Sequence, residues 1–188
     1  MLTDQEKHTL LRLARETIES YLSGGRRSRL EATSAGLREH CGAFVTLTEH
    51  GQLRGCIGHL QSDEELHHTI QEMAIAAATQ DPRFRPVTRA ELADLHIEIS
   101  VLSPMVKVAD ISDIEVGRDG LYIVSGYSSG VLLPQVATEW GWDRDEFLRQ
   151  VCRKAGLPRD SWKAGSTLYR FSAQVFDEQA SDMLDPDQ

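Results

Sequence analysis

A thiol and a guanidinium occur two residues apart in a segment whose residue pattern predicts a strand. Arg54 and Cys56 belong to the run Leu53-Arg54-Gly55-Cys56-Ile57-Gly58. Alternate side chains of a strand point to the same face, so we expect the two side by side, about 6–7 Å apart along the strand. A nearby cation favours the thiolate, which is the reactive form of cysteine, and a guanidinium can anchor an anionic substrate. The spacing therefore predicts a site in which Cys56 reacts and Arg54 assists.

The two glycines of this run, Gly55 and Gly58, weaken a strand and therefore need a reason. One reason is the close approach of another group, and both glycines would then line a substrate-binding surface. The other reason is relief of crowding against a helix, in which case Cys56 would be a small buried apolar side chain. The sequence leaves both interpretations open.

A histidine and a second arginine complete the candidate side chains. His59 is the candidate general base, although a regular strand would place it on the face opposite to Cys56. Arg83 follows Asp81-Pro82, which we interpret as a turn, and is a candidate substrate anchor at a cleft. No histidine or cysteine pair has zinc-type spacing, so the sequence assigns no metal ligand and no cofactor.

The elements that position these residues alternate between helical and extended patterns. Two predicted hairpins, at His50-Gly51 and Asp119-Gly120, favour a largely antiparallel or mixed sheet with packed helices, which is an α+β fold. We expect a single domain over 1–188, with an N-terminal helix in 1–25, a core in 40–176 and an acidic tail in 177–188. The predicted helices cover 3–22, 62–80 and 143–155, with a short helix or turn at 88–91. The predicted strands cover 43–48, 53–58, 96–102, 121–124 and 167–176, and residues 125–130 are predicted as a loop.

Composition limits the classes of partner. The chain has 188 residues and a net charge of −9, which disfavours nucleic acid and anionic lipid as partners. Three cysteines without a paired spacing are typical of a reducing compartment, and Cys41 and Cys152 are interpreted as structural. No transmembrane run and no signal peptide is evident, so a cytoplasmic location is expected.

Several motifs together resemble the AMME chromosomal region candidate gene family, whose bacterial and archaeal members are also called AmmeMemoRadiSam system protein A. The similar segments are 41–47, 53–58, 81–84, 100–104, 132–136, 142–143 and 154–157. The resemblance implies an α+β fold of two unequal lobes around a cleft, and a functional surface at residues 54–58. It also implies partners of the Memo and radical SAM types, although this chain lacks the CxxxCxxC motif of a radical SAM enzyme. Arg85 departs from the proline that the family often has at this position.

Two hypotheses of function follow from these residues. In the first, Cys56 and Arg54, aided by His59, act on a small anionic or carbonyl-bearing molecule, with Gly55, Gly58, Arg83 and Gln135 contacting the substrate. In the second, the chain is a non-catalytic module whose glycine surface and 125–130 loop dock Memo-type or radical SAM partners. A third hypothesis is metal or redox sensing through Cys56.

Overall fold

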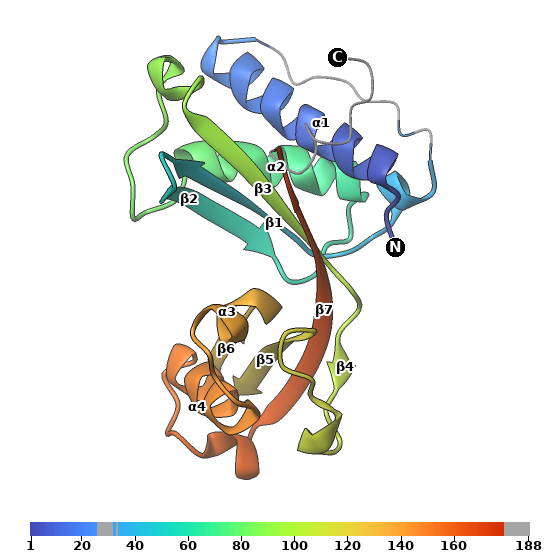
Figure 1. Cartoon of the computed structure of the whole chain (residues 1–188), viewed down its shortest axis with the longest axis vertical. Coiled ribbons are helices and arrows are strands. Elements are labelled where there is room, and N and C mark those ends of the chain that lie inside the picture. Colours follow the sequence, from blue (N-terminus) through green and yellow to red (C-terminus); the bar gives the residue numbers. More distant parts are fainter. Residues whose placement is uncertain (26–31, 33, 179–188) are drawn as a thin grey trace. The chain divides into compact units, whose positions relative to one another are not determined.

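The computed structural model describes residues 1–25, 32 and 34–178 of the chain (Figure 1). Most of the predicted acidic tail therefore lies outside the described residues, as does much of the connection after the first helix. Contacts between residues divide the chain into two compact units, one of residues 1–102 with the chain from 174 onward, and one of residues 103–173. None of the described helices has the length and apolar character that crossing a membrane requires.

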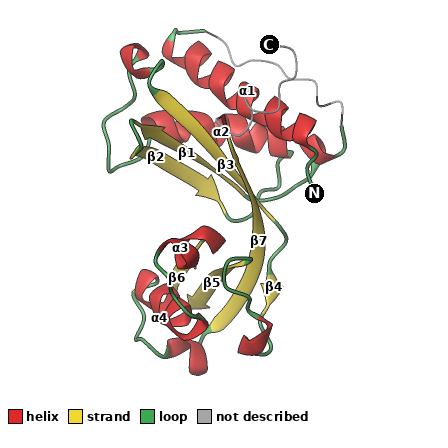
Figure 2. Cartoon of the chain, viewed as in Figure 1, coloured by secondary structure: helices red, strands yellow, loops and turns green. Residues whose placement is uncertain are grey.

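The first unit is a three-stranded antiparallel sheet with two helices packed against one of its faces (Figure 2). Its helices are α1 (Asp4–Leu22) and α2 (Leu66–Thr79), with short 3-10 turns at Gly36–Arg38 and Arg89–Glu91. Its strands are β1 (Ala43–Glu49), β2 (Gln52–His59) and β3 (Leu95–Leu102), joined by the end of β7 (Thr167–Asp177). The strand order β2-β1-β3-β7 leaves β2 at the edge of the sheet.

Side-chain alternation explains why the helices cover only one face of this sheet. Ala43, Val45 and Leu47 of β1 are fully buried on the helix side, whereas the residues between them are half-buried. An apolar face of this kind must pack against another element, and the apolar stripes of α1 and α2 provide it. The capping box of Thr3 and Glu6 fixes the start of α1, as the sequence predicts.

The second unit packs two helices against a smaller antiparallel sheet of order β6-β5-β7-β4. Its remaining strands are β4 (Val106–Lys107), β5 (Asp119–Ser125) and β6 (Ser128–Leu132). Its helices are α3 (Pro134–Glu139) and α4 (Arg144–Lys154), with 3-10 turns at Ile111–Asp113 and Ser161–Lys163. Its core holds the fully buried Phe147, Leu121 and Val151. The α+β prediction with a largely antiparallel sheet is confirmed.

Three local predictions are wrong. Asp119-Gly120 is part of β5, because the chain turns earlier, at residues 116–118. The predicted loop over 125–130 is mostly strand, since Gly126 has φ +57 and closes a two-residue hairpin with Tyr127. Ser62 does not open a capping box: its hydroxyl pairs with Thr69, and α2 begins after Glu65. The sequence pattern did not predict helix α3, whose first residue is a proline.

Candidate functional site

Cys56 lies on the face of the first sheet that the helices leave uncovered. The register pairs Cys56 with Thr46 of β1, and the Thr46 hydroxyl donates a hydrogen bond to the Cys56 sulfur at 3.3 Å. The Cys56 amide points away from β1 and donates to Asp81 Oδ2 at 2.9 Å. Side chains of such a non-hydrogen-bonded pair lie close together, which explains the contact between hydroxyl and sulfur. The half-buried Cys56 is therefore held by Thr46 at its sulfur and by Asp81 at its amide.

The turn after α2 closes the open edge of β2 through one carboxylate. The Asp81 side chain is 2% exposed and accepts from the Cys56 amide, the Arg83 amide and the Arg83 guanidinium. The Arg83 guanidinium, with the two amides, holds the pKa of Asp81 well below its ordinary value despite burial of the carboxylate. Asp81 is thus the residue that ties Arg83 to the strand carrying Cys56.

Arg83 is the cation that shares a carboxylate with the Cys56 backbone, because its guanidinium and the Cys56 amide both donate to Asp81 Oδ2. Its pKa is raised by the hydrogen bonds to Asp81 first, and attraction to Cys56 is one of the further contributions. Its side chain is 54% exposed, and the guanidinium lies 5.4 Å from the centre of the Phe84 ring. The structure therefore brings together Cys56 and Arg83, two residues 27 positions apart in sequence.

Arg54 is directed to a different group. The register between β1 and β2 skips Arg54 at a bulge opposite Leu47 and Thr48, and bulges re-aim side chains. Its guanidinium donates to Glu91 Oε1 at 2.8 Å and to the Arg85 carbonyl at 2.9 Å. The strand alternation that predicts Arg54 beside Cys56 does not hold through this bulge.

The two glycines accommodate groups that approach each face of β2. A Cβ on buried Gly55 would lie 2.1 Å from the Ala77 carbonyl oxygen of α2, so the helix packs directly on this position. A Cβ on Gly58 would lie 2.3 Å from the Phe44 ring, its cross-strand neighbour. Close packing explains both glycines, and for Gly55 the relief of crowding against the alanine-rich helix is the reason observed.

Two predicted site residues remain, His59 and Gln135. His59 is exposed and pairs with Ala43, whose side chain is buried on the helix side, so His59 lies on the sheet face opposite to Cys56. Gln135 belongs to α3 of the second unit. Its Oε1 atom is buried and has no hydrogen-bond partner among the described residues. His59 therefore does not join Cys56 on its sheet face, and Gln135 belongs to the other unit.

Comparisons with known proteins identify the family. The AMMECR1 family model matches residues 11–176. The chain belongs to the AMMECR1 family. A protein of Methanothermobacter thermautotrophicus is 46% identical over 185 residues, which cover 94% of this chain and 96% of that one. A Thermococcus onnurineus protein is 46% identical over 190 residues, which cover 95% of this chain and 93% of that one. The crystal structure of uncharacterized protein PH0010 from Pyrococcus horikoshii has a TM-score of 0.85 at 42% identity, covering 91% of this chain and 90% of that one.

The sequence did not predict two residues near Cys56 in the sheet of this AMMECR1 protein. Thr46 contacts the sulfur, and Glu98 of β3 pairs with Thr46 in the same cross-strand row. Counting back through the hairpin at His50-Gly51 would have found Thr46, because it and Cys56 lie at nearly equal distances from the turn. The role of Asp81 could not be found this way, since its contact with the Cys56 amide joins segments 25 residues apart.

Among the residues that the structure describes, two groups of side chains are close enough together to hold a metal ion. One is Glu65 with His67 and His68, and the other is Glu49 with His50 and Asp94. In the first group, His67 Nδ1 already lies 3.1 Å from the Leu37 carbonyl oxygen. Neither group includes Cys56, so a metal at these positions would not act on the thiol.

The Arg54–Glu91 pair predicts how the stability of this AMMECR1 protein depends on pH. The Arg54 hydrogen bond, aided by Thr88, lowers the pKa of Glu91 from 4.5 to about 2. Because the folded-state pKa lies below the unfolded one, this contribution is present above pH 4.5 and is lost as the pH falls toward 2. Between pH 5 and pH 3 the free energy of unfolding should fall by roughly 2 kcal/mol more for the wild type than for Glu91→Gln. Urea unfolding at each pH measures this difference. Glutamine can retain the cap at Thr88, and the exposed Glu64→Gln is the control. Parallel pH profiles of wild type and Glu91→Gln would contradict the ion pair.

Proposed function

We propose that Cys56 is a reactive thiol in a site for a small anionic or carbonyl-bearing molecule, and that Arg83 is its cation. The observation that carries the proposal is that Cys56 lies on the sheet face opposite the helices of its unit. Its sulfur accepts from the Thr46 hydroxyl, and its amide donates to the carboxylate that also holds the half-exposed Arg83. A thiolate adds to an electrophilic carbon, and a guanidinium binds negative charge that a substrate carries or develops. These two functions belong to one small patch of the first unit.

Each neighbour has a distinct role in this proposal. Thr46 donates a hydrogen bond to the sulfur and thereby orients it. Asp81 positions Arg83 with a two-point hydrogen bond and fixes the Cys56 backbone. Arg54, bound to Glu91 and to the Arg85 carbonyl, is a positioning residue that holds the segment carrying Arg83 along the edge of β2. His59 has no role here, because it lies on the other face of the sheet.

The family resemblance extends the proposal to the cellular location and the pathway of the protein. We infer a cytoplasmic location and a pathway that includes Memo-type and radical SAM proteins. In a deletion strain, Cys56→Ala should fail to restore the metabolite profile, whereas Cys41→Ala should restore it. Full restoration by Cys56→Ala would favour the non-catalytic docking module instead.

Selective alkylation tests the reactivity of Cys56 directly. Burial raises the pKa of Cys41 to about 11 and also raises the pKa of the fully buried Cys152, so both should react slowly near pH 7. Iodoacetamide at pH 7 should therefore label Cys56 fastest, as measured by mass spectrometry of the three cysteine peptides over time. Labelling in urea supplies the intrinsic rate of each peptide. Labelling of Cys56 at or below the rate of Cys41 in the folded protein would count against the proposal.

A further inference from the structure

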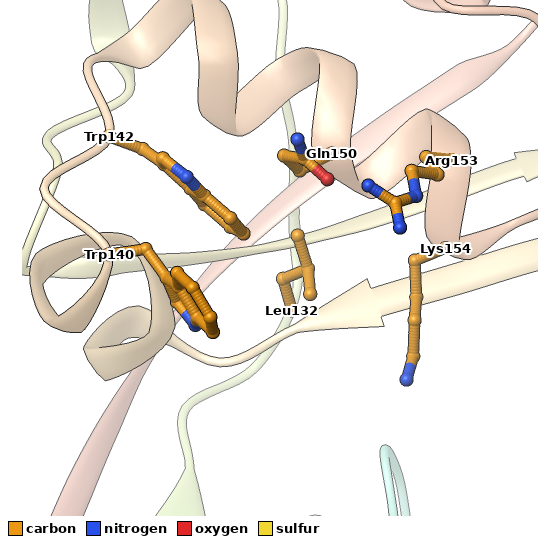
Figure 3. Close-up of a pocket in the computed structure, with 6 residues that line it drawn as sticks. All are labelled: Leu132, Trp140, Trp142, Gln150, Arg153 and Lys154. Atoms are coloured by element: carbon orange, nitrogen blue, oxygen red, sulfur yellow. The ribbon is translucent and has the colours of Figure 1, made fainter.

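A pocket in the second unit combines aromatic rings with cations. It has a volume of about 600 Å³ and is lined by Leu132, Trp140, Trp142, Gln150, Arg153 and Lys154 (Figure 3). Ligand pockets typically measure 300–1,000 Å³ and combine apolar walls with a few polar groups. All six residues belong to the unit of residues 103–173, so the pocket is complete within it.

The backbone holds the two indoles parallel. Gly141 between them has φ +64, which reverses the chain after α3 in a left-handed conformation. The Trp142 amide donates to the Ala137 carbonyl and the Gly141 amide to the Thr138 carbonyl, which is the Schellman pattern of a helix end. The ring centres are 6.1 Å apart and the planes differ by 17°. The helix end therefore fixes the backbone of both residues, and their rings lie nearly parallel without a ligand.

Exposure distinguishes the two rings. Trp142 packs against the buried core of the unit, whereas Trp140 remains 70% exposed. A large aromatic side chain that is held rigidly but left in water has an unused π-face on which a planar ring can stack. Base–aromatic stacking of this kind contributes substantially to ligand affinity in nucleotide-binding proteins.

The opposite wall of the pocket is positively charged. Figure 3 shows Arg153 and Lys154, from the last turn of α4, across the pocket from the indoles. Within the described chain neither head group has an ion-pair or hydrogen-bond partner, and the lining contains no carboxylate. The helix C-terminus favours cations at these positions but leaves their N–H donors unused. This local positive wall stands out on a chain whose net charge is −9.

The positive wall continues along α4. A neighbouring hollow of about 380 Å³ shares Gln150 and Arg153 and adds Arg149 and Arg159. Glu146 partly neutralises those two arginines, at 3.3 and 3.6 Å. The surface therefore runs from stacked rings at one end to several guanidinium groups at the other.

We propose that this pocket binds a planar aromatic ligand that carries a negative group, the class that mononucleotides represent. The ring stacks on Trp140, and the phosphate pairs with Arg153 and Lys154. The lining of this pocket shares no residue with the proposed Cys56 site, so either proposal can fail without the other. A protein-docking patch built on the same tryptophans would need the rings but not the two cations.

Indole NMR signals provide the test. The 188-residue chain has three tryptophans, and Trp162 serves as an internal reference because its Nε1 atom is buried and its side chain lines a different pocket. Titration with AMP, GMP, CMP and UMP at millimolar concentration should shift the ¹⁵N–¹H signals of Trp140 and Trp142 saturably and leave Trp162 in place. Adenosine, which lacks the charge, and inorganic phosphate, which lacks the ring, should each bind about tenfold more weakly than AMP.

Variants separate the contributions of ring and charge. Trp140→Leu and the double change Arg153→Gln with Lys154→Gln should each weaken AMP binding about tenfold or more. Tyr127→Ala, which removes another fully exposed aromatic ring, and Lys107→Gln, an exposed cation of the same unit, should leave it unchanged. The proposal is overturned if no mononucleotide shifts the Trp140 signal, if adenosine binds as tightly as AMP, or if the double variant retains wild-type affinity.

Discussion

Asp81→Asn should lower the free energy of unfolding by about 2–3 kcal/mol, because one carboxylate accepts four hydrogen bonds. Its Oδ2 atom accepts from the Cys56 amide and from Arg83, and its Oδ1 atom accepts from the Arg83 amide and guanidinium. In either orientation, an asparagine amide would direct its NH₂ group at one of these donor sets. Arg83 is half-exposed and regains water, so the expected cost is that of the lost charged hydrogen bonds.

Thermal unfolding measures this prediction. The expected loss corresponds to a decrease of roughly 4–12 °C in Tm for a chain of this size. Asp63→Asn is the matched control, because Asp63 is exposed and should leave Tm within error. A Tm of Asp81→Asn equal to that of the control would show that the carboxylate does not join the turn to β2.

Gly55→Val should destabilise the first unit by about 3 kcal/mol or more, because the new side chain has no space. Its Cβ would lie 2.1 Å from a backbone oxygen of α2, and backbone cannot rotate away as a side chain can. The helix would have to move off the sheet, and α2 buries eleven of its fourteen residues. We expect Gly55→Val to expose core surface and to lower the urea concentration at the midpoint of unfolding.

The same experiment separates a packing role from a substrate-binding role at this glycine. Gln52→Val places the same side chain at an exposed position of the same strand and should be tolerated. If Gly55→Val were as stable as this control, α2 would not pack on Gly55, and the position would be free to contact a substrate.

The elements of this fold could be predicted because they depend on local patterns. The capping box at Thr3 and Glu6 marks the start of α1, Asp143 caps α4, and the alternation over 96–102 corresponds to β3. Helix α3 escaped prediction because its six residues are too few to show a helical period.

The site could be predicted only in part, because its contacts depend on tertiary structure. Cys56 is on the expected strand, but one extra residue in the ladder directs Arg54 to Glu91. Strand alternation assumes a regular ladder, and a bulge breaks that assumption without a signal in the residue types. Arg83 is linked to the Cys56 amide through Asp81, in a turn that follows a fourteen-residue helix, and no local pattern can specify a contact over that sequence separation.

The rate of Cys56 alkylation in Arg83→Gln tests the central claim that Arg83 and Cys56 act as a pair. Iodoacetamide labelling of the Cys56 peptide should be compared across pH 6–9 in the wild type, in Arg83→Gln and in Arg54→Gln. Near-neutral labelling should slow about threefold to tenfold in Arg83→Gln, because an attractive charge is removed from the thiolate. Arg54→Gln should change the rate less, since that guanidinium binds Glu91. Equal rates in the wild type and Arg83→Gln, or a larger loss in Arg54→Gln, would contradict the account.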